Sequence, residues 1–305
     1  MAQTLERLTR RTNTMQSIRS IVRTMKTMSA INAAPYEQAA EAIDVWRETV
    51  LDGLHAFLRC HGPVRQARAD SPDQVLIVMG SDHGLCGNYN ELLAREVTQH
   101  PYAGPGQIIC VGAQMQDALL GEGLAPVTTL LPPANTDGLI RLAGQLVTRL
   151  DRIRARSPAG DLAAALVYTQ RGAHGTHAPV AQALLPLDPD MIEALIQRPW
   201  NSRSLPQFSM PAADLLAALV RNLVFATLYR AAAEALVTEN AARLARMQQA
   251  EQSVDEKLEA LTSETRSVRQ SEITTELLDV IVGFEALKAR AKRQKRGQAA
   301  EDHQT

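Results

Sequence analysis

Two long stretches with the hydrophobic spacing of a helix stand at the two ends of the chain, and they constrain its fold more than any other feature. The first covers residues 1–62. Its seam reads Met15, Ile18, Val22, Met25, Ser29, Asn32, Tyr36, Ala39, Ile43, Trp46, Val50, Leu54 and Phe57. A period near 3.5 is typical of a coiled coil. A continuous helix from about residue 3 to residue 60 would span about 85 Å, longer than a compact domain is wide. Pro35 predicts a bend inside it.

The second stretch covers residues 210–292 and has no proline after Pro211. Its seam reads Leu244, Met247, Val254, Leu258, Leu261, Thr265 and Val268, then slips by one position to Ile273, Leu277, Val280, Phe284 and Leu287. The charges along it exclude a membrane span, so a helix of this length indicates a coiled coil. We predict that the two terminal helices pair as an antiparallel coiled coil, with an ordinary helical bundle as the alternative. A basic and polar tail, residues 293–305, follows.

Between these stretches, residues 70–200 have the pattern of a compact insert. The apolar runs at 74–79, 107–112, 126–131 and 162–168 are separated by segments of helical length, such as 88–99 and 137–155. Strands that alternate with helices predict a mainly parallel sheet buried on both faces. The proline-rich stretch "THAPVAQALLPLDPD" predicts an edge strand and an exit loop. The predicted fold class is therefore a Rossmann-like α/β insert between the helices of a long antiparallel coiled coil.

The remaining composition narrows the compartment. Three cysteines, Cys60, Cys86 and Cys110, lack the spacing of a zinc site and are odd in number, so a reducing compartment fits best. The Arg- and Thr-rich N-terminus is like a transit peptide, but the helical seam continues far beyond any cleavage point. No apolar run approaches the roughly 20 residues that cross a bilayer. We expect a protein that is soluble, or peripheral to a membrane through its partners.

The stretch "GSDHGLCGNYN", residues 80–90, follows the first predicted strand and is the first candidate for an active site. Its glycines fit neither dinucleotide-binding nor phosphate-loop spacing, and it contains no lysine. Asp82, His83 and Cys86 leave a nucleophile pair or a metal site open. The alternative, which we favour, is a glycine-rich turn in which Asp82 caps amides, Cys86 packs as a small apolar residue and Asn88 caps the next helix.

Two further groups of residues carry a weak signal. His174 and His177 share a glycine-rich loop and could touch a metal, but no third ligand is spaced with them. The cluster Lys288, Arg290, Lys292, Arg293, Lys295 and Arg296 could bind nucleic acid or anionic lipid. We favour an exposed loop and a solvated helix end, since no aromatic residues interleave the basic cluster.

Three motifs in order resemble the gamma subunit of F-type ATP synthases: the N-terminal "MQSIRSIVRTMKTMSAIN", the stretch "VLIVMGSDHGLCGNYN", and the C-terminal "TENAARLARMQQA" followed by "RQSEITTELLDVIVG". The resemblance runs over most of the chain. It implies a non-catalytic rotor shaft that turns inside a ring of alpha and beta subunits, with its α/β domain against the epsilon subunit and the membrane ion-carrying c-ring. It implies no cofactor, no metal and no nucleic-acid partner. The expected location is peripheral, on the cytoplasmic face of the bacterial inner membrane.

By the same resemblance, six residues help to couple rotation to catalysis: Met25, Lys26, Arg243, Gln270, Thr274 and Glu276. On their helix, Gln270, Thr274 and Glu276 are expected to form a polar strip toward the surrounding ring. A solvated position is the alternative for each of the six. The turn residues Asp82, Gly84, Leu85, Cys86 and Gly87 are the family fingerprint.

The chain also departs from the family's pattern. Pro35 and the loss of basic residues in "TMSAINAAPYEQ" alter the N-terminal helix, His83 stands where Arg is common, Asn88 and Tyr89 replace the usual Gly-Leu, and the tail past Leu287 is longer. These departures suggest a divergent branch, such as a second, alternative ATPase of its host. The cysteine pair of the plant-type redox switch is missing, so no thiol regulation is predicted.

Two other classes of function stay open at this stage. A Rossmann-like enzyme would bind a nucleotide or small substrate as an isolated chain. A helical adaptor would bind nucleic acid through the basic tail, with an affinity that falls as salt rises. The sequence favours neither H⁺ nor Na⁺ as the coupling ion, and neither synthesis nor hydrolysis of ATP.

Overall fold

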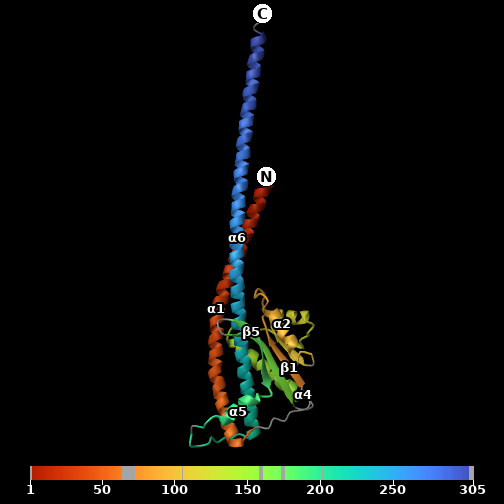
Figure 1. The fold of residues 1–305 in the computed structure, drawn as a ribbon, viewed down its shortest axis with the longest axis vertical. Helices are drawn as coiled ribbons and strands as arrows, with labels where there is room; N and C mark the ends of the chain where they lie inside the picture. The colour runs from red at the N-terminus through yellow and green to blue at the C-terminus, as the bar shows by residue number, and fades with distance from the viewer. Residues whose placement is uncertain are drawn as a thin grey trace. The chain divides into compact units, whose positions relative to one another are not determined.

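Two long helices, one at each end of the chain, dominate the fold (Figure 1). The computed structural model describes residues 2–63, 73–104, 106–157, 161–172, 176–200 and 202–301, with side chains from 4 to 288. Helix α1 spans Ala2–His61 and helix α6 spans Ala212–Glu301. The predicted terminal helices are confirmed. Helix α1 runs through Pro35 without interruption, and α6 continues past 292 into the predicted tail.

The chain divides into two units. The coiled-coil unit consists of Met1–Thr24 and Gln248–Thr305, and the α/β unit consists of Met25–Met247. In the coiled-coil unit α1 and α6 are antiparallel: Arg19 pairs with Asp255 at 2.6 Å and Arg23 with Glu251 at 2.7 Å. As the residue number on α1 rises by four, the number of its partner on α6 falls by four. The predicted antiparallel pairing is confirmed.

The seam of α1 repeats every seven residues, and only three of its predicted positions were wrong. Buried or half-buried side chains recur at Leu8, Met15, Val22, Ser29, Tyr36, Ile43, Val50 and Phe57, seven of which were predicted. A second row consists of Arg19, Lys26, Ala33, Ala40 and Arg47. The predicted Met25 and Ala39 lie next to it and are half-buried too, whereas the predicted Ile18, Asn32 and Trp46 are exposed. Ile18 is 36% exposed and Trp46 49%. The aliphatic stems of Arg and Lys cover apolar surface while their charged ends stay in water, so apolarity alone marks the wrong neighbour.

A five-stranded sheet forms the centre of the α/β unit. The strands are β1 (Asp73–Met79), β2 (Gln107–Val111), β3 (Thr128–Leu130), β4 (Leu162–Arg171) and β5 (His177–Leu185). Their order is β3-β2-β1-β4-β5. The first four strands are parallel, and β5 runs antiparallel to β4. This confirms the predicted strands and the edge position of β5, which contains Pro179.

Four shorter helices complete this unit: α2 (Tyr89–Gln99), α3 (Ala113–Gly121), α4 (Asp137–Arg156) and α5 (Pro189–Gln197). Helices α2 and α4 were predicted, and α3 was not identified. Helix α5 lies where an exit loop was expected. Its start had a readable signal, because the Asp188 side chain accepts a hydrogen bond of 3.0 Å from the Asp190 amide and Pro189 occupies the first turn.

The two faces of the sheet bury different helices. Leu76 and Val78 point to the face that α2 and α3 cover. Ile77 and Met79 alternate with them and pack against α4 and against residues 224–237 of α6, where α1 contributes Tyr36 and Ala40. Helix α6 is therefore a core helix of the α/β unit as well as a member of the coiled coil.

One described helix segment, Ala212–Lys288, meets the length and hydropathy requirements of a membrane span, and its most apolar window is 28% buried. The expectation that no segment would do so was too strict. Part of the same helix packs on the sheet, and a core helix of a soluble protein has the same composition.

Candidate functional site

The turn between β1 and α2, residues 80–88, is shaped by its backbone. Leu85 has φ +67° and Gly87 has φ +72°, both in the left-handed region. A left-handed residue other than glycine is uncommon and marks a turn held by its surroundings. The Gly80 amide donates to the Val111 carbonyl at 2.9 Å, which ties the start of the turn to the end of β2.

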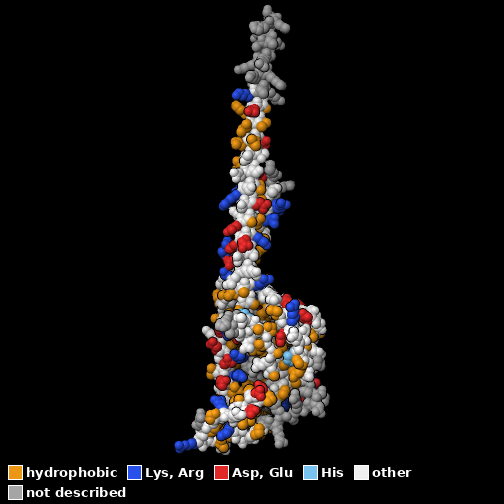
Figure 2. Space-filling view, in the orientation of Figure 1, with side chains coloured by type: hydrophobic (Ala, Val, Ile, Leu, Met, Phe, Trp, Pro, Cys, Tyr) orange, Lys and Arg blue, Asp and Glu red, His pale blue; other side chains and the backbone are white. Residues whose placement is uncertain are grey.

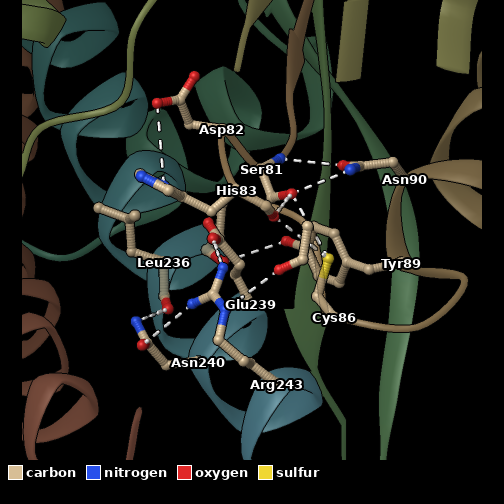
Figure 3. Close-up of polar contacts among 12 residues, drawn as sticks. Ser81, Asp82, His83, Cys86, Tyr89, Asn90, Leu236, Glu239, Asn240 and Arg243 are labelled. Carbon is tan, nitrogen blue, oxygen red and sulfur yellow. Dashed lines mark hydrogen bonds and ion pairs between the residues drawn. The ribbon is translucent and has the colours of Figure 1, made fainter. Parts of the chain in front are cut away.

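Ser81 and Asn90 close this turn from inside. The Ser81 amide donates to Asn90 Oδ1 at 2.9 Å, and Asn90 Nδ2 donates to Ser81 Oγ at 2.9 Å (Figure 3). Ser81 Oγ in turn donates to the His83 carbonyl at 2.9 Å. Both side chains are buried, so the loop is fixed by a satisfied polar network.

Asp82 caps a helix, as predicted, but that helix is α3. Its Oδ1 accepts a hydrogen bond of 3.0 Å from the Ala113 amide, and the Met115 amide donates to the Ser81 carbonyl at 3.2 Å. Two hydrogen bonds therefore connect the turn after β1 to the start of α3, which follows β2. Asn88 occupies the N-cap position of α2 but its side chain makes no capping hydrogen bond, so this part of the prediction was wrong.

Cys86 and His83 do not form a nucleophile pair in this arrangement. The Cys86 thiol is buried and lies 3.5 Å from Ser81 Oγ and 3.8 Å from the His83 carbonyl, while the His83 ring is 81% exposed. Burial raises the pKa of the Cys86 thiol, which disfavours the reactive thiolate. The packing role that the sequence suggested for Cys86 is the one observed.

Helix α6 contributes a buried ion pair to the site. Glu239 is 4% exposed and accepts a hydrogen bond from Arg243, whose Nε also lies 3.5 Å from the Gly84 carbonyl. Burial raises the pKa of Glu239, and the Arg243 charge lowers it in part. Arg243 thus joins the buried Glu239 carboxylate of α6 to the exposed backbone of the turn at Gly84 (Figure 3).

Two more contacts join α6 to the end of β4. The Thr238 hydroxyl lies 3.2 Å from the Thr169 carbonyl and 3.1 Å from the Tyr89 hydroxyl. Glu234, 3% exposed, accepts hydrogen bonds from Arg171 Nε at 2.8 Å and from the Arg171 amide at 3.0 Å. Arg171 Nη1 forms an ion pair with Glu37 on α1.

The residues that the family resemblance marked for coupling lie in both units. Met25 and Lys26 are half-buried on α1, and Arg243 pairs with Glu239. Gln270, Thr274 and Glu276 are exposed, and Thr274 Oγ1 donates to the Gln270 carbonyl at 2.8 Å. Helix geometry places position i+6 about 120° around the axis from position i. Glu276 therefore does not share one strip with Gln270, and that part of the prediction was wrong.

The metal and nucleic-acid signals receive no support from the described residues. No group of three or more His, Cys, Asp or Glu is placed to hold a metal within that part of the chain. His177 is exposed at the start of β5, and His174 lies outside the described residues. Of the basic cluster, only the side chain of Lys288 is described, and it is exposed.

Sequence reasoning missed Tyr89, Thr238, Glu239 and Glu234. A signal existed in "AAAEALVTENAA", because an acid placed among small residues of a core helix must find a buried partner. The partner of Glu239 is Arg243, four residues along the same helix. The partners of Glu234 and Tyr89 lie on segments more than sixty residues away and had no signal in the sequence.

Comparison with known proteins agrees with this architecture. A protein-family model described as ATP synthase matches residues 4–287. The ATP synthase gamma chain of Nitratidesulfovibrio vulgaris is 28% identical over 242 residues, which cover 74% of this chain and 78% of that one. The gamma chain of Cyanothece sp. is 28% identical, with 90% and 97% covered.

Solved structures show the same fold. The rotor of the Euglena gracilis mitochondrial ATP synthase superimposes with a TM-score of 0.62 at 15% sequence identity, over 90% of this chain and 100% of that one. A second structure of that enzyme gives a TM-score of 0.63 at 17% identity. With the family model matching nearly its whole length, the chain belongs to the ATP synthase gamma-chain family.

Proposed function

We propose that this chain is the central-stalk rotor subunit of an F-type ATP synthase, which transmits rotation between an ion-conducting membrane sector and catalytic subunits on other chains. One observation supports this most directly: α6 extends past the end of α1 and carries exposed apolar side chains there. Within the coiled-coil unit, the register of the two ion pairs places Ala2 about level with Glu272. From Glu276 to Lys288 every side chain is exposed.

The apolar residues of this overhang form a stripe. Ile273, Leu277, Val280, Phe284 and Leu287 recur at intervals of four and three residues, and each is 60% exposed or more. Hydrophobic side chains, in orange, are visible along the upper part of the helix (Figure 2). A stripe with this spacing is the surface of a helix that packs against other protein. A shaft that turns inside a ring of subunits needs such a surface, and it needs no catalytic group of its own.

The partners and location follow as part of the same proposal. The overhang of α6 lies inside the ring of alpha and beta subunits, and the α/β unit contacts the epsilon subunit and the c-ring. The complex lies on the cytoplasmic face of a bacterial inner membrane. Met25, Lys26, Arg243, Gln270, Thr274 and Glu276 take part in coupling, and catalysis belongs to the other subunits.

Capture of partner subunits tests this function. The tagged chain, expressed in its host, should recover alpha and beta subunits in the family's stoichiometry. Leu277→Asp should reduce that recovery at least about tenfold, because burying a leucine contributes roughly 1.5–3 kcal/mol and a carboxylate resists burial. Leu277 is 60% exposed in the chain itself, so the chain's own unfolding midpoint should not change.

The matched control is Ser267→Asp, which adds the same charge at an exposed position of α6 within the part that α1 accompanies. It should recover both subunits as the unmodified chain does. Failure of the unmodified chain to recover alpha and beta subunits would refute the rotor function. Tight binding of a nucleotide to the isolated chain in calorimetry would favour the enzyme alternative instead.

A further inference from the structure

The polar contacts between α6 and the sheet form one group in the α/β unit. Glu234 reaches Arg171 at the end of β4, Thr238 reaches Thr169 on β4, and Arg243 reaches the turn after β1. We call this group, together with Tyr89, the α6 joint. Its members on α6 lie between residues 234 and 243, a length of about 13 Å along the helix. The joint therefore holds α6 at more than one height.

Tyr89 occupies the centre of this joint. Its side chain is buried at the first residue of α2, and its hydroxyl lies 3.1 Å from the Ala235 carbonyl and 3.1 Å from Thr238 Oγ1. Thr238 is fully buried and also lies within 3.2 Å of the Thr169 carbonyl. Tyr89 and Thr238 thus link three segments, α2, α6 and β4, through two hydroxyl groups.

Each of the two hydroxyls has one proton to donate. When Tyr89 donates its proton to the Ala235 carbonyl, Thr238 can donate to Tyr89, to the Thr169 carbonyl at 3.2 Å, or to the Glu234 and Ala235 carbonyls of its own helix, both at 3.0 Å. Burial raises the pKa of Tyr89, which keeps the phenol protonated and able to donate. No described polar atom of this link lacks a partner.

These hydrogen bonds oppose a rotation of α6 about its own axis that its apolar contacts with the sheet permit. Around them α6 presents small and aliphatic residues to the sheet, among them Ala231, Ala232 and Leu236. Apolar contact is not directional and permits a helix to turn or slide by small amounts. A hydrogen bond weakens steeply as its angle departs from linear, so the Tyr89 link opposes rotation of α6 about its own axis.

We propose that Tyr89 is a positioning residue that fixes the rotational setting of α6 against the α/β domain through its bonds to Ala235 and Thr238. This rests on the proposed rotor function, in which rotation of the shaft must reach the domain. The Tyr89 ring fills space in either case, and the hydroxyl supplies the stiffness. Removal of the hydroxyl leaves the fold intact and makes the joint torsionally softer.

A single-molecule measurement of stiffness tests this proposal. The alpha–beta ring of the purified complex is fixed to a surface, and a gold rod is attached to the α/β domain through Leu120→Cys, a half-exposed site at the end of α3, in a Cys60→Ser background. The variance of the rod angle in the stalled complex reports torsional stiffness. Tyr89→Phe and Thr238→Val should each raise this variance at least about 1.5-fold, as expected when one of a few directional bonds is lost.

Two matched controls separate stiffness from general damage. Thr238→Ser keeps the hydroxyl and should retain the variance of the unmodified complex. Tyr102→Phe removes a phenol hydroxyl that has no bond in the described structure and should also leave the variance unchanged. An unchanged variance in Tyr89→Phe or Thr238→Val complexes that assemble normally overturns the proposal.

The same variants are read out in the full chain alone. Hydrogen exchange of the α6 amides at residues 235–243 should speed up severalfold in Tyr89→Phe and in Thr238→Val, and not in the two controls. If the unmodified chain does not assemble with alpha and beta subunits, the rotor function fails, while this exchange still decides whether Tyr89 holds α6. Unchanged exchange in both test variants overturns the positioning role.

Discussion

Gly112 links the turns after β1 and β2, and its replacement by alanine tests how closely those turns are packed. Gly112 has φ +107°, a conformation that favours glycine. A Cβ built there would lie 2.4 Å from the Ser81 carbonyl oxygen and 2.9 Å from the Gly80 carbonyl oxygen. These are backbone atoms that a rotamer change cannot move, so the two turns must separate.

The expected cost combines three terms. A positive φ for alanine costs roughly 1–2 kcal/mol, and forcing a methyl group into a packed site costs roughly 1–3 kcal/mol. Alanine restricts the unfolded chain and returns about 0.4–1 kcal/mol. The Gly112→Ala variant should therefore lose about 2–4 kcal/mol of unfolding free energy.

Gly123 provides the matched control. It has φ +78°, but a Cβ placed on it would meet nothing within 4 Å, so Gly123→Ala carries the conformational term without the clash. That variant should lose only about 0.5–1.5 kcal/mol. The difference between the two variants isolates the contact with the Ser81 carbonyl.

Urea unfolding followed by tryptophan fluorescence measures both variants, since Trp46 and Trp200 both belong to the α/β unit. With a slope of about 1–3 kcal/mol per molar urea, Gly112→Ala should lower the midpoint by roughly 1–2 M. Equal losses in Gly112→Ala and Gly123→Ala would show that the turns are not in the contact described.

Three further outcomes are expected. The pKa of Glu239 is raised, chiefly by burial, so the native state holds this proton to a higher pH than the unfolded chain does. The unfolding free energy of the unmodified chain, relative to that of Glu239→Gln, should therefore rise as pH falls from 8 to 5. Urea titrations at several pH values measure this difference, and a constant difference would contradict the prediction. Arg23→Gln removes the 2.7 Å ion pair with Glu251, in which the Arg23 side chain is 53% exposed and the Glu251 side chain 16%. The variant should lose about 0.2–1 kcal/mol of unfolding free energy at low salt and less at high salt. A loss in thermal melts that does not depend on salt would indicate a packing effect instead. Dithiol reductant should leave the ATPase activity of the complex unchanged, because Cys86 and Cys110 are buried, Cys60 is half-buried and burial raises the pKa of Cys110 to about 12; any reproducible activation would reveal a thiol switch.

Periodicity was sufficient to predict the helices and strands and insufficient to place every face. The repeat at Leu8, Val22, Tyr36 and Val50 was readable because apolar residues recur at one heptad position. The burial of Arg19 and Arg47 in place of the exposed Ile18 and Trp46 was not readable, since these arginines cover the seam with their stems and rank as polar in any pattern of hydrophobicity. Helix α3 was missed because "AQMQDALLG" is short and has no capping side chain at Gly112.

The candidate site could be predicted only in its local half. Asp82 was expected to cap amides from its place after a strand, and Cys86 to pack, because both statements depend on the turn itself. Two hydrogen bonds join distant segments: Tyr89 to Ala235, 146 residues apart, and Arg171 to Glu234, 63 residues apart. No sequence pattern in either segment indicates which other segment it contacts. The sequence does indicate that Glu234 needs a hydrogen-bond donor. Glu234 lies among alanines of a helix whose apolar content requires burial, and a buried carboxylate without a donor would cost several kcal/mol. A buried acid in an alanine-rich core helix therefore predicts a joint before its partner is known, and the fold supplies the partner when the end of β4 brings Arg171 to the same height of α6.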